Sequence, residues 1–338
     1  LRDDPGFHAQ NVYAIVMRTL ARFEFALGRR VNWGFGAHQI KVAPHAFADP
    51  NAYYSARDEA LMFGYFHRLK KGARQPVYTC LSHDIIAHET GHAILDGLRP
   101  LFFEASSLQT AAFHEFVADL TAIMISLLNN QLRWAVAETA DGDLSNESII
   151  SALAEEFGHY SRGRPHLRSA RNKKTMAQVS GETSPYPWSE VLTGAMWQIL
   201  SGMFAKYKAT PTQRTGKPPT DKQALLWAVN RFRRVAFQPL DYLPPADVQF
   251  SDYASAVLIA DELVDPVDED EYRVLMRAFF EERGIEFNEP ESDRLNFYAY
   301  DIDRVSRSRT DAYHFLHENR RQLCIPADQD VFVVDLYR

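Results

Sequence analysis

Apolar residues recur at helical spacing over residues 10–27, and Gly28 follows directly after them. An apolar stripe with a period of 3.6 residues that stops at a glycine predicts one amphipathic helix. Two shorter stretches alternate apolar and polar side chains, which predicts a strand or hairpin over 31–43 and another strand over 60–66. The first part of the chain is therefore expected to hold one helix and a small sheet.

Two longer stretches with apolar residues at helical spacing follow and predict neighbouring helices. The first covers residues 82–96, with Gly97 expected to end it, and the second covers 108–128. Pro100 and two serines lie in the connection between them. Most of the remaining chain is expected to be helical, with polar loops at 138–146, 163–180 and 210–220.

This order of elements predicts an α+β protein with two lobes and a cleft between them. At 338 residues and 46% hydrophobic composition, the chain is long enough for one large core or two smaller ones. We expect an N-terminal α/β lobe over 1–100, a mainly helical lobe over 101–286 and an appended segment over 287–338. That last segment has a helix-like middle and a strand-like end at 330–336.

Charge and composition narrow the range of partners. The formal net charge is −7, and nucleic-acid-binding proteins usually carry an excess of basic residues, so we expect no nucleic acid partner. No apolar run approaches the roughly 18 residues of a membrane span, so a soluble protein without such a span is expected. Cys80 and Cys324 predict two buried thiols rather than a disulfide framework. Because the chain opens at Leu1 without a methionine, we expect upstream residues, a secretory signal among the possibilities, and the compartment and oligomeric state stay open.

His88 and His92 carry the clearest chemical signal, because Glu89 directly follows the first of them in an apolar, helix-compatible run. Two histidines four apart lie one turn apart on the same helical face, so both imidazoles can reach one Zn²⁺. The adjacent glutamate can reach a water at the metal. This His-Glu-x-x-His pattern is typical of zinc peptidases.

A catalytic zinc site needs a third protein ligand and one open position. Glu115 is the candidate, because it lies on the second apolar helix and shares a face with Asp119 at a spacing of four. Asp119 is then placed to accept a hydrogen bond from the far nitrogen of a ligand histidine and fix its tautomer. The neighbouring His114 is a competing ligand on the same helix.

This set of residues resembles the gluzincin metallopeptidases, and most closely the thermolysin family, over roughly residues 9–286. Asn51 and Ala52 match the edge segment that holds the substrate backbone in that family. Arg168 is similar to the arginine that binds the substrate carbonyl just past the scissile bond. The resemblance places Ile85 and Leu167 in the pocket for the next side chain, which implies a preference for a hydrophobic residue there.

The chain also departs from the family pattern. The family's transition-state tyrosine corresponds to Phe103, and its oxyanion-binding histidine has no clear counterpart. Tyr186 lies in that neighbourhood and is a candidate replacement donor. The loss of one such donor typically costs about 10²–10³ in rate, which predicts a slow enzyme. Ser126 stands where a calcium ligand is expected, so we expect zinc without bound calcium.

The resulting prediction is a zinc-dependent endopeptidase acting on a peptide or protein substrate, with Glu89 as the general base. The alternative is a weakly active or inactive thermolysin-like domain that keeps structural zinc and binds a peptide or protein partner. Phe103 favours that alternative, whereas the intact Glu89 favours the enzyme, because a structural zinc site has no need of a base. An aminopeptidase is less favoured, since the chain has no Gly-x-Met-x-Asn-like segment.

Overall fold

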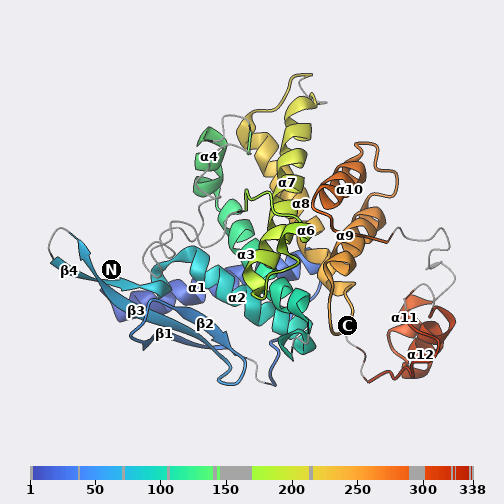
Figure 1. The fold of residues 1–338 in the computed structure, drawn as a ribbon, viewed down its shortest axis with the longest axis horizontal. Coiled ribbons are helices and arrows are strands. Elements are labelled where there is room, and N and C mark those ends of the chain that lie inside the picture. The colour runs from blue at the N-terminus through green and yellow to red at the C-terminus, as the bar shows by residue number, and fades with distance from the viewer. Residues whose placement is uncertain are drawn as a thin grey trace. The chain divides into compact units, whose positions relative to one another are not determined.

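The computed structural model divides the chain into two compact units, Leu1–Phe287 and Asn288–Arg338. The first unit contains the sheet and most of the helices (Figure 1). The three-part division expected from the sequence stays a prediction. The structure describes residues 3–36, 39–70, 73–104, 107–139, 143–144, 170–212, 216–288, 301–320, 323, 325–334 and 336.

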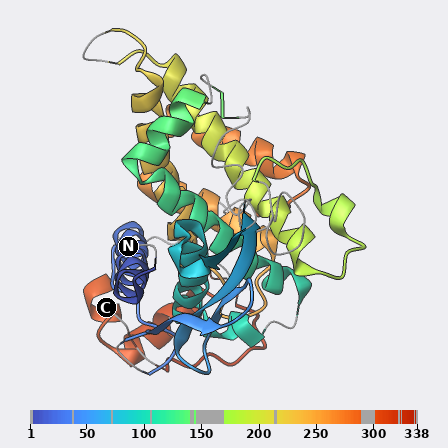
Figure 2. The same cartoon turned by 90° about the vertical axis from the view of Figure 1, so that its left-hand side faces the viewer.

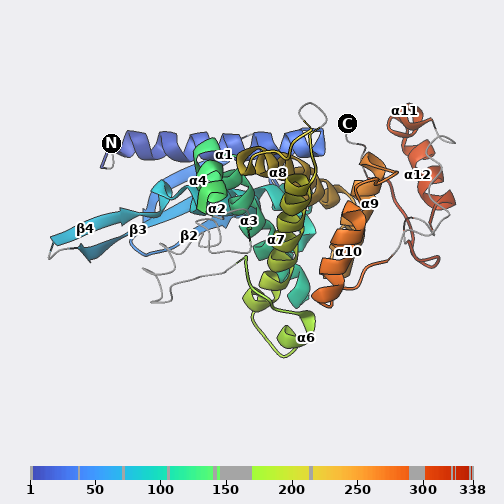
Figure 3. The ribbon, with the colours of Figure 1, turned by 90° about the horizontal axis from the view of Figure 1, so that it is seen from above.

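Helix α1 (Pro5–Leu27) begins earlier than its apolar stripe predicts. The Asp4 side chain accepts a hydrogen bond from the Gly6 backbone N–H at 2.9 Å, and Pro5 occupies the first helical turn. Both features favour a helix start, because the first N–H groups of a helix have no partner inside it. The Asp4 side chain satisfies one of them, and Pro5 has no N–H to satisfy. The helix ends as predicted at Gly28, which has a φ of 71°. Figures 2 and 3 show α1 along its axis and from the side.

The sheet has four strands arranged around β3 (Ala60–Lys70). This strand pairs in parallel with β1 (Lys41–Phe47) and antiparallel with both β2 (Ala52–Ser55) and β4 (Ala73–Tyr78). Within the described residues, β2 has β3 as its strand partner and leaves its other side toward α2. The sheet is small, as the sequence predicts.

The strand expected over 31–43 is wrong for most of its length, because β1 begins only at Lys41. Val31 is 7% exposed and belongs to the large helical core, and Trp33 packs against that core. Alternating apolar residues in this stretch therefore bury themselves among helices instead of pairing in the sheet.

Helices α2 (His83–Leu98) and α3 (Leu108–Leu127) match the two predicted helices closely. Ser107 caps α3 by accepting a hydrogen bond from the Thr110 backbone N–H at 3.1 Å. Gly97, expected to end α2, lies inside it. A Cβ at Gly97 would stand 1.9 Å from the Asn32 carbonyl oxygen, so this glycine permits a close approach of backbone to helix.

Gly91 allows α2 and α3 to pack closely, because it has no side chain at their contact. A Cβ at this position would lie 2.9 Å from Thr121 Oγ1 and 3.0 Å from Ala118 Cα. We expect Gly91→Ala to lower the stability of the metal-free protein by about 1–3 kcal/mol, because the added methyl overpacks the contact between the helices. Thermal unfolding in the presence of a chelator measures this effect. Gly181→Ala is the control, since a Cβ there meets nothing within 4 Å, and equal melting temperatures for the two variants would contradict the assignment.

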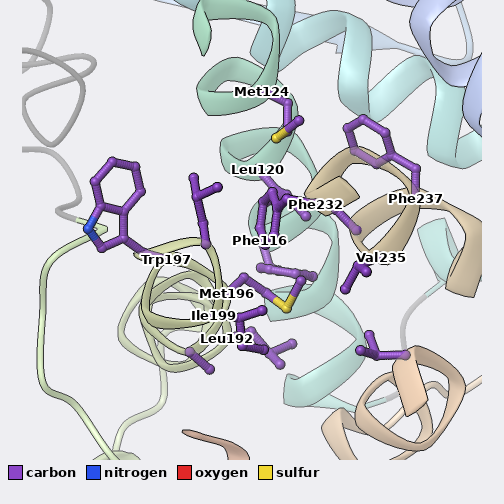
Figure 4. Close-up of a cluster of buried hydrophobic side chains, with 14 of the residues drawn as sticks. Phe116, Leu120, Met124, Leu192, Met196, Trp197, Ile199, Phe232, Val235 and Phe237 are labelled. Carbon is purple, nitrogen blue, oxygen red and sulfur yellow. The ribbon is translucent and has the colours of Figure 1, made fainter. Parts of the chain in front are cut away.

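The main core lies among α3, α7 (Pro185–Ala209) and α8 (Asp221–Phe237). Figure 4 shows Phe116 and Leu120 of α3 beside Met196 of α7 and Phe232 of α8. Helix α3 is long and apolar enough to cross a membrane, but 83% of its apolar window is buried within this core. The other elements of the first unit are η1 (Thr79–Leu81), η2 (Pro100–Glu104), α4 (Asn130–Thr139), α6 (Met176–Val179), η4 (Gln238–Asp241), α9 (Phe250–Val264) and α10 (Tyr272–Glu282).

The second unit contains α11 (Ile302–Val305) and α12 (Arg309–Glu318), as its helix-like middle predicts. The strand expected at 330–336 is wrong, because none of the described residues in that stretch forms a strand. Phe332 and Val334 are 79% and 81% exposed. An apolar alternation becomes a strand only when a partner satisfies its backbone groups.

Candidate metal centre

Helix α2 carries His88 and His92 on the side that meets α3, where they contact Glu115, Asp119 and His114. The two imidazole rings lie edge to face with their centroids 4.9 Å apart, as one helical turn between them requires. Gly91 lies between them in sequence and permits the close packing of α3 described above. The apolar positions that bury α2 therefore also fix where both imidazoles point.

Glu115 completes a three-residue group from the facing helix. His88 Nε2 lies 3.8 Å from Glu115 Oε2, and one ligand atom from each of His88, His92 and Glu115 lies within 4.8 Å of the others. Ligand atoms that share one zinc at about 2.0–2.2 Å lie roughly 3–4 Å from each other. Two imidazoles and one carboxylate at this spacing fit a zinc ion after a small contraction.

Asp119 lies on the opposite side of the His88 ring. Its Oδ1 is 3.0 Å from His88 Nδ1, and both side chains are largely buried. A carboxylate at Nδ1 keeps the proton on that nitrogen and leaves Nε2 as the atom available to a metal. The geometry therefore brings Asp119 to the position that its spacing from Glu115 predicts.

Glu89 connects α2 to the sheet. Its side chain is buried, and Oε2 accepts a hydrogen bond from the Tyr54 backbone N–H at 3.1 Å. The contact ties the carboxylate to strand β2 and limits its rotamers. The sequence does not reveal this partner, because the bond joins a side chain of α2 to the backbone of a strand distant in sequence.

The Tyr54 N–H also identifies the edge of β2 that has no strand partner among the described residues. The Asn51 carbonyl accepts from the Gly64 N–H at 2.9 Å and so faces β3. Backbone groups of successive residues in an antiparallel strand point to opposite edges. Ala52 and Tyr54 therefore direct their backbone groups away from β3 and toward Glu89.

A second contact fixes β2 against α2. The Tyr54 hydroxyl donates to Asp96 Oδ2 at 2.6 Å, and Asp96 is 5% exposed. Burial raises the pKa of the Asp96 carboxyl, and the bond from Tyr54 partly opposes this rise. The sequence does not reveal this pair, since the bond joins side chains of a strand and a helix that are distant in sequence.

His114, the competing ligand that the sequence offers, lies beside the group of His88, His92 and Glu115. Its Nδ1 lies 3.5 Å from His92 Nδ1, and burial lowers the pKa of His114 to about 4. The ring is therefore neutral near pH 7, and its Nδ1 can accept a hydrogen bond from His92 Nδ1. The Phe103 ring packs edge to face on His114, with centroids 4.6 Å apart, and so stands beside the centre without a hydroxyl.

The remaining predicted site residues are placed less completely. Ile85 is buried in the core that joins α1, the sheet and α2. Tyr186 lies in the first turn of α7 and is 43% exposed. Leu167 and Arg168 lie outside the described residues. The substrate, oxyanion and pocket roles of these residues stay predictions.

The described residues form many helices and one small mixed sheet, which is consistent with a thermolysin-like fold. Among solved structures, the chain is similar to the precursor of protealysin, a metalloproteinase from Serratia proteamaculans, with a TM-score of 0.51 and 14% sequence identity. The match covers 84% of this chain and 80% of that chain. No protein-family model and no curated protein matches the sequence. The similarity establishes a distant fold relationship.

We expect Asp119→Ala to weaken zinc binding by about 10–100-fold, because His88 loses the carboxylate that orients its ring. Asp119→Asn should lose less, since its amide oxygen still accepts from Nδ1. Competition with a chromophoric chelator measures both affinities. Identical zinc affinities for Asp119→Ala and the unaltered protein would show that Asp119 does not orient a zinc ligand.

Proposed function

We propose that the protein is a zinc-dependent peptidase that cuts internal peptide bonds. The observation that carries this proposal is the convergence of His88, His92 and Glu115, with Glu89 fixed beside them at the edge of β2 that faces away from β3. A structural site would use four protein ligands and no base. Three candidate ligands with a carboxylate close by support a catalytic centre.

His88, His92 and Glu115 would hold the metal in this proposal, and Asp119 would orient His88. Zinc bound there supplies a Lewis acid that polarises the substrate carbonyl and lowers the pKa of water to about 7. Glu89 accepts the proton of the attacking water and delivers it to the departing amine. The Tyr54 N–H keeps the Glu89 carboxylate in place for both transfers.

The substrate would bind as an added strand on β2. The Ala52 backbone groups and the Tyr54 carbonyl face the edge of β2 that has no strand partner among the described residues, which suits an extended peptide. The Tyr54 N–H at the same edge is already bonded to Glu89. In this arrangement Asn51 and the Ala52 carbonyl contact the substrate backbone, and Arg168 holds the carbonyl beyond the cut. Ile85 and Leu167 would form an apolar pocket for the residue after the scissile bond.

A second candidate function is binding of a peptide or protein by a weakly active or inactive relative. Phe103 supports it, because this ring packs on His114 beside the centre and has no hydroxyl to offer an oxyanion. Tyr186 is the proposed compensating donor in the enzyme. A hydrogen-bond donor at an oxyanion is worth about 10²–10³ in rate, so low activity is expected if Tyr186 does not supply one.

Digestion of a peptide library with and without a chelator tests the proposal. Internal cuts that a chelator abolishes and added zinc restores are the expected result, with a hydrophobic residue after the cut. Trimming of single residues would identify an exopeptidase instead. Peptides left intact by the zinc-loaded protein would favour the binding function.

A further inference from the structure

A second group of metal-binding side chains comes from α1, β1 and η1 and shares no residue with the group of His88, His92 and Glu115. His8 is in the first turns of α1, His45 is in β1, and Cys80 is in η1 directly before α2. One ligand atom from each of the three lies within 4.8 Å of the others. We propose that His8, His45 and Cys80 form a second metal site, which binds Zn²⁺ through two imidazole nitrogens and one thiolate.

The distances require little movement. His8 Nδ1 and His45 Nε2 are 2.7 Å apart and share a hydrogen bond. Two nitrogens bound to one tetrahedral zinc at about 2.0–2.1 Å lie about 3.3 Å apart, and a thiolate binds at about 2.3 Å. The imidazoles therefore have to separate by about 0.6 Å, and His45 can do so because it is exposed.

Two of the donors are held in place by the fold. His8 is 1% exposed and Cys80 is fully buried. The Asn11 side chain donates to the Cys80 carbonyl at 3.0 Å, so the turn that carries the thiol is fixed to the same helix that carries His8. The Tyr78 ring packs on both imidazoles, at 4.6 Å from His8 and 5.0 Å from His45.

The buried thiol has to lose its proton when a metal binds. Burial raises the pKa of the Cys80 thiol to about 11, so the thiol is protonated before metal binds. An incoming Zn²⁺ displaces the thiol proton to solvent and compensates the thiolate charge that burial disfavours.

The donor set selects the class of ion. A thiolate with two imidazoles favours borderline and soft ions such as Zn²⁺ over Ca²⁺ or Mg²⁺, which prefer oxygen. Three protein donors leave a fourth corner for water at the exposed His45 side. The ion would connect α1, β1 and η1, and η1 directly precedes the helix that carries His88 and His92.

Cobalt substitution tests the site in the full chain under a phosphine reductant. Cobalt(II) bound by a thiolate gives a charge-transfer absorption in the near ultraviolet, whereas the centre at His88 contains no sulfur. We expect this band in the unaltered protein and also in Glu115→Gln, which disables the first centre. The result is therefore independent of whether the protein hydrolyses peptides.

Three variants assign the band. Cys80→Ala and His45→Gln should each abolish it, and His45→Gln is the safer test of folding because its side chain is exposed. Cys324→Ser is the matched thiol control and should leave the band intact. A missing band in the unaltered protein, a band that survives Cys80→Ala, or a band lost in Cys324→Ser would overturn the proposal.

Discussion

Replacing Glu89 by Gln is expected to lower peptide hydrolysis by about 10²–10⁴-fold while the zinc content stays unchanged. The amide has the shape of the carboxylate and still offers an oxygen to the Tyr54 N–H, which donates to Glu89 at 3.1 Å. The variant therefore keeps the position of the side chain but cannot accept the proton of water. Rates on a single chromogenic peptide, set beside zinc content by atomic absorption, measure the effect.

Glu104→Gln provides the control for this experiment. Glu104 lies in η2 close to the centre in sequence, and it is exposed. Its loss should change neither activity nor zinc content. Undiminished hydrolysis by Glu89→Gln would show that Glu89 is not the base.

Glu115→Gln is expected to remove one equivalent of zinc per chain and all zinc-dependent hydrolysis. Glu115 Oε2 lies 3.8 Å from His88 Nε2, and a neutral amide oxygen is a much poorer zinc ligand than a carboxylate. The loss of affinity should exceed the roughly 10–100-fold typical of a residue that only orients a ligand. Dialysis against a zinc buffer followed by metal analysis measures it.

The comparison of Glu115→Gln with Asp119→Ala separates the two roles. Both residues lie on α3 near His88, but only Glu115 is expected to contact the metal directly. The variant of Glu115 should therefore lose more affinity than the variant of Asp119. The reverse order would exchange their roles, and equal zinc content in all proteins would exclude both.

The site helices could be predicted from the sequence because their signals are local. The four-residue spacing of His88 and His92 fixes one face of a helix, and the same spacing relates Glu115 to Asp119. The apolar periodicity of both helices then predicts that they pack together. In the structure the two helices do pack together, and His88 contacts both Glu115 and Asp119.

The contacts that depend on tertiary packing could not be predicted. The bond from the Tyr54 N–H to Glu89 requires the register of β2, which no local pattern reveals. Gly97 lies inside α2 instead of ending it, and the sequence could not show why a glycine is needed there, because the Asn32 carbonyl that crowds it comes from a distant segment. The failed strands at 31–40 and 330–336 show that alternation predicts burial or pairing only where a partner exists.

An anomalous-difference map from crystals of the zinc-loaded protein, recorded at the zinc absorption edge, tests the central claim most directly. The account predicts a peak within bonding distance of nitrogens of His88 and His92 and a carboxylate oxygen of Glu115. An empty position between those imidazoles, with the Glu115 carboxylate directed into solvent, would contradict it.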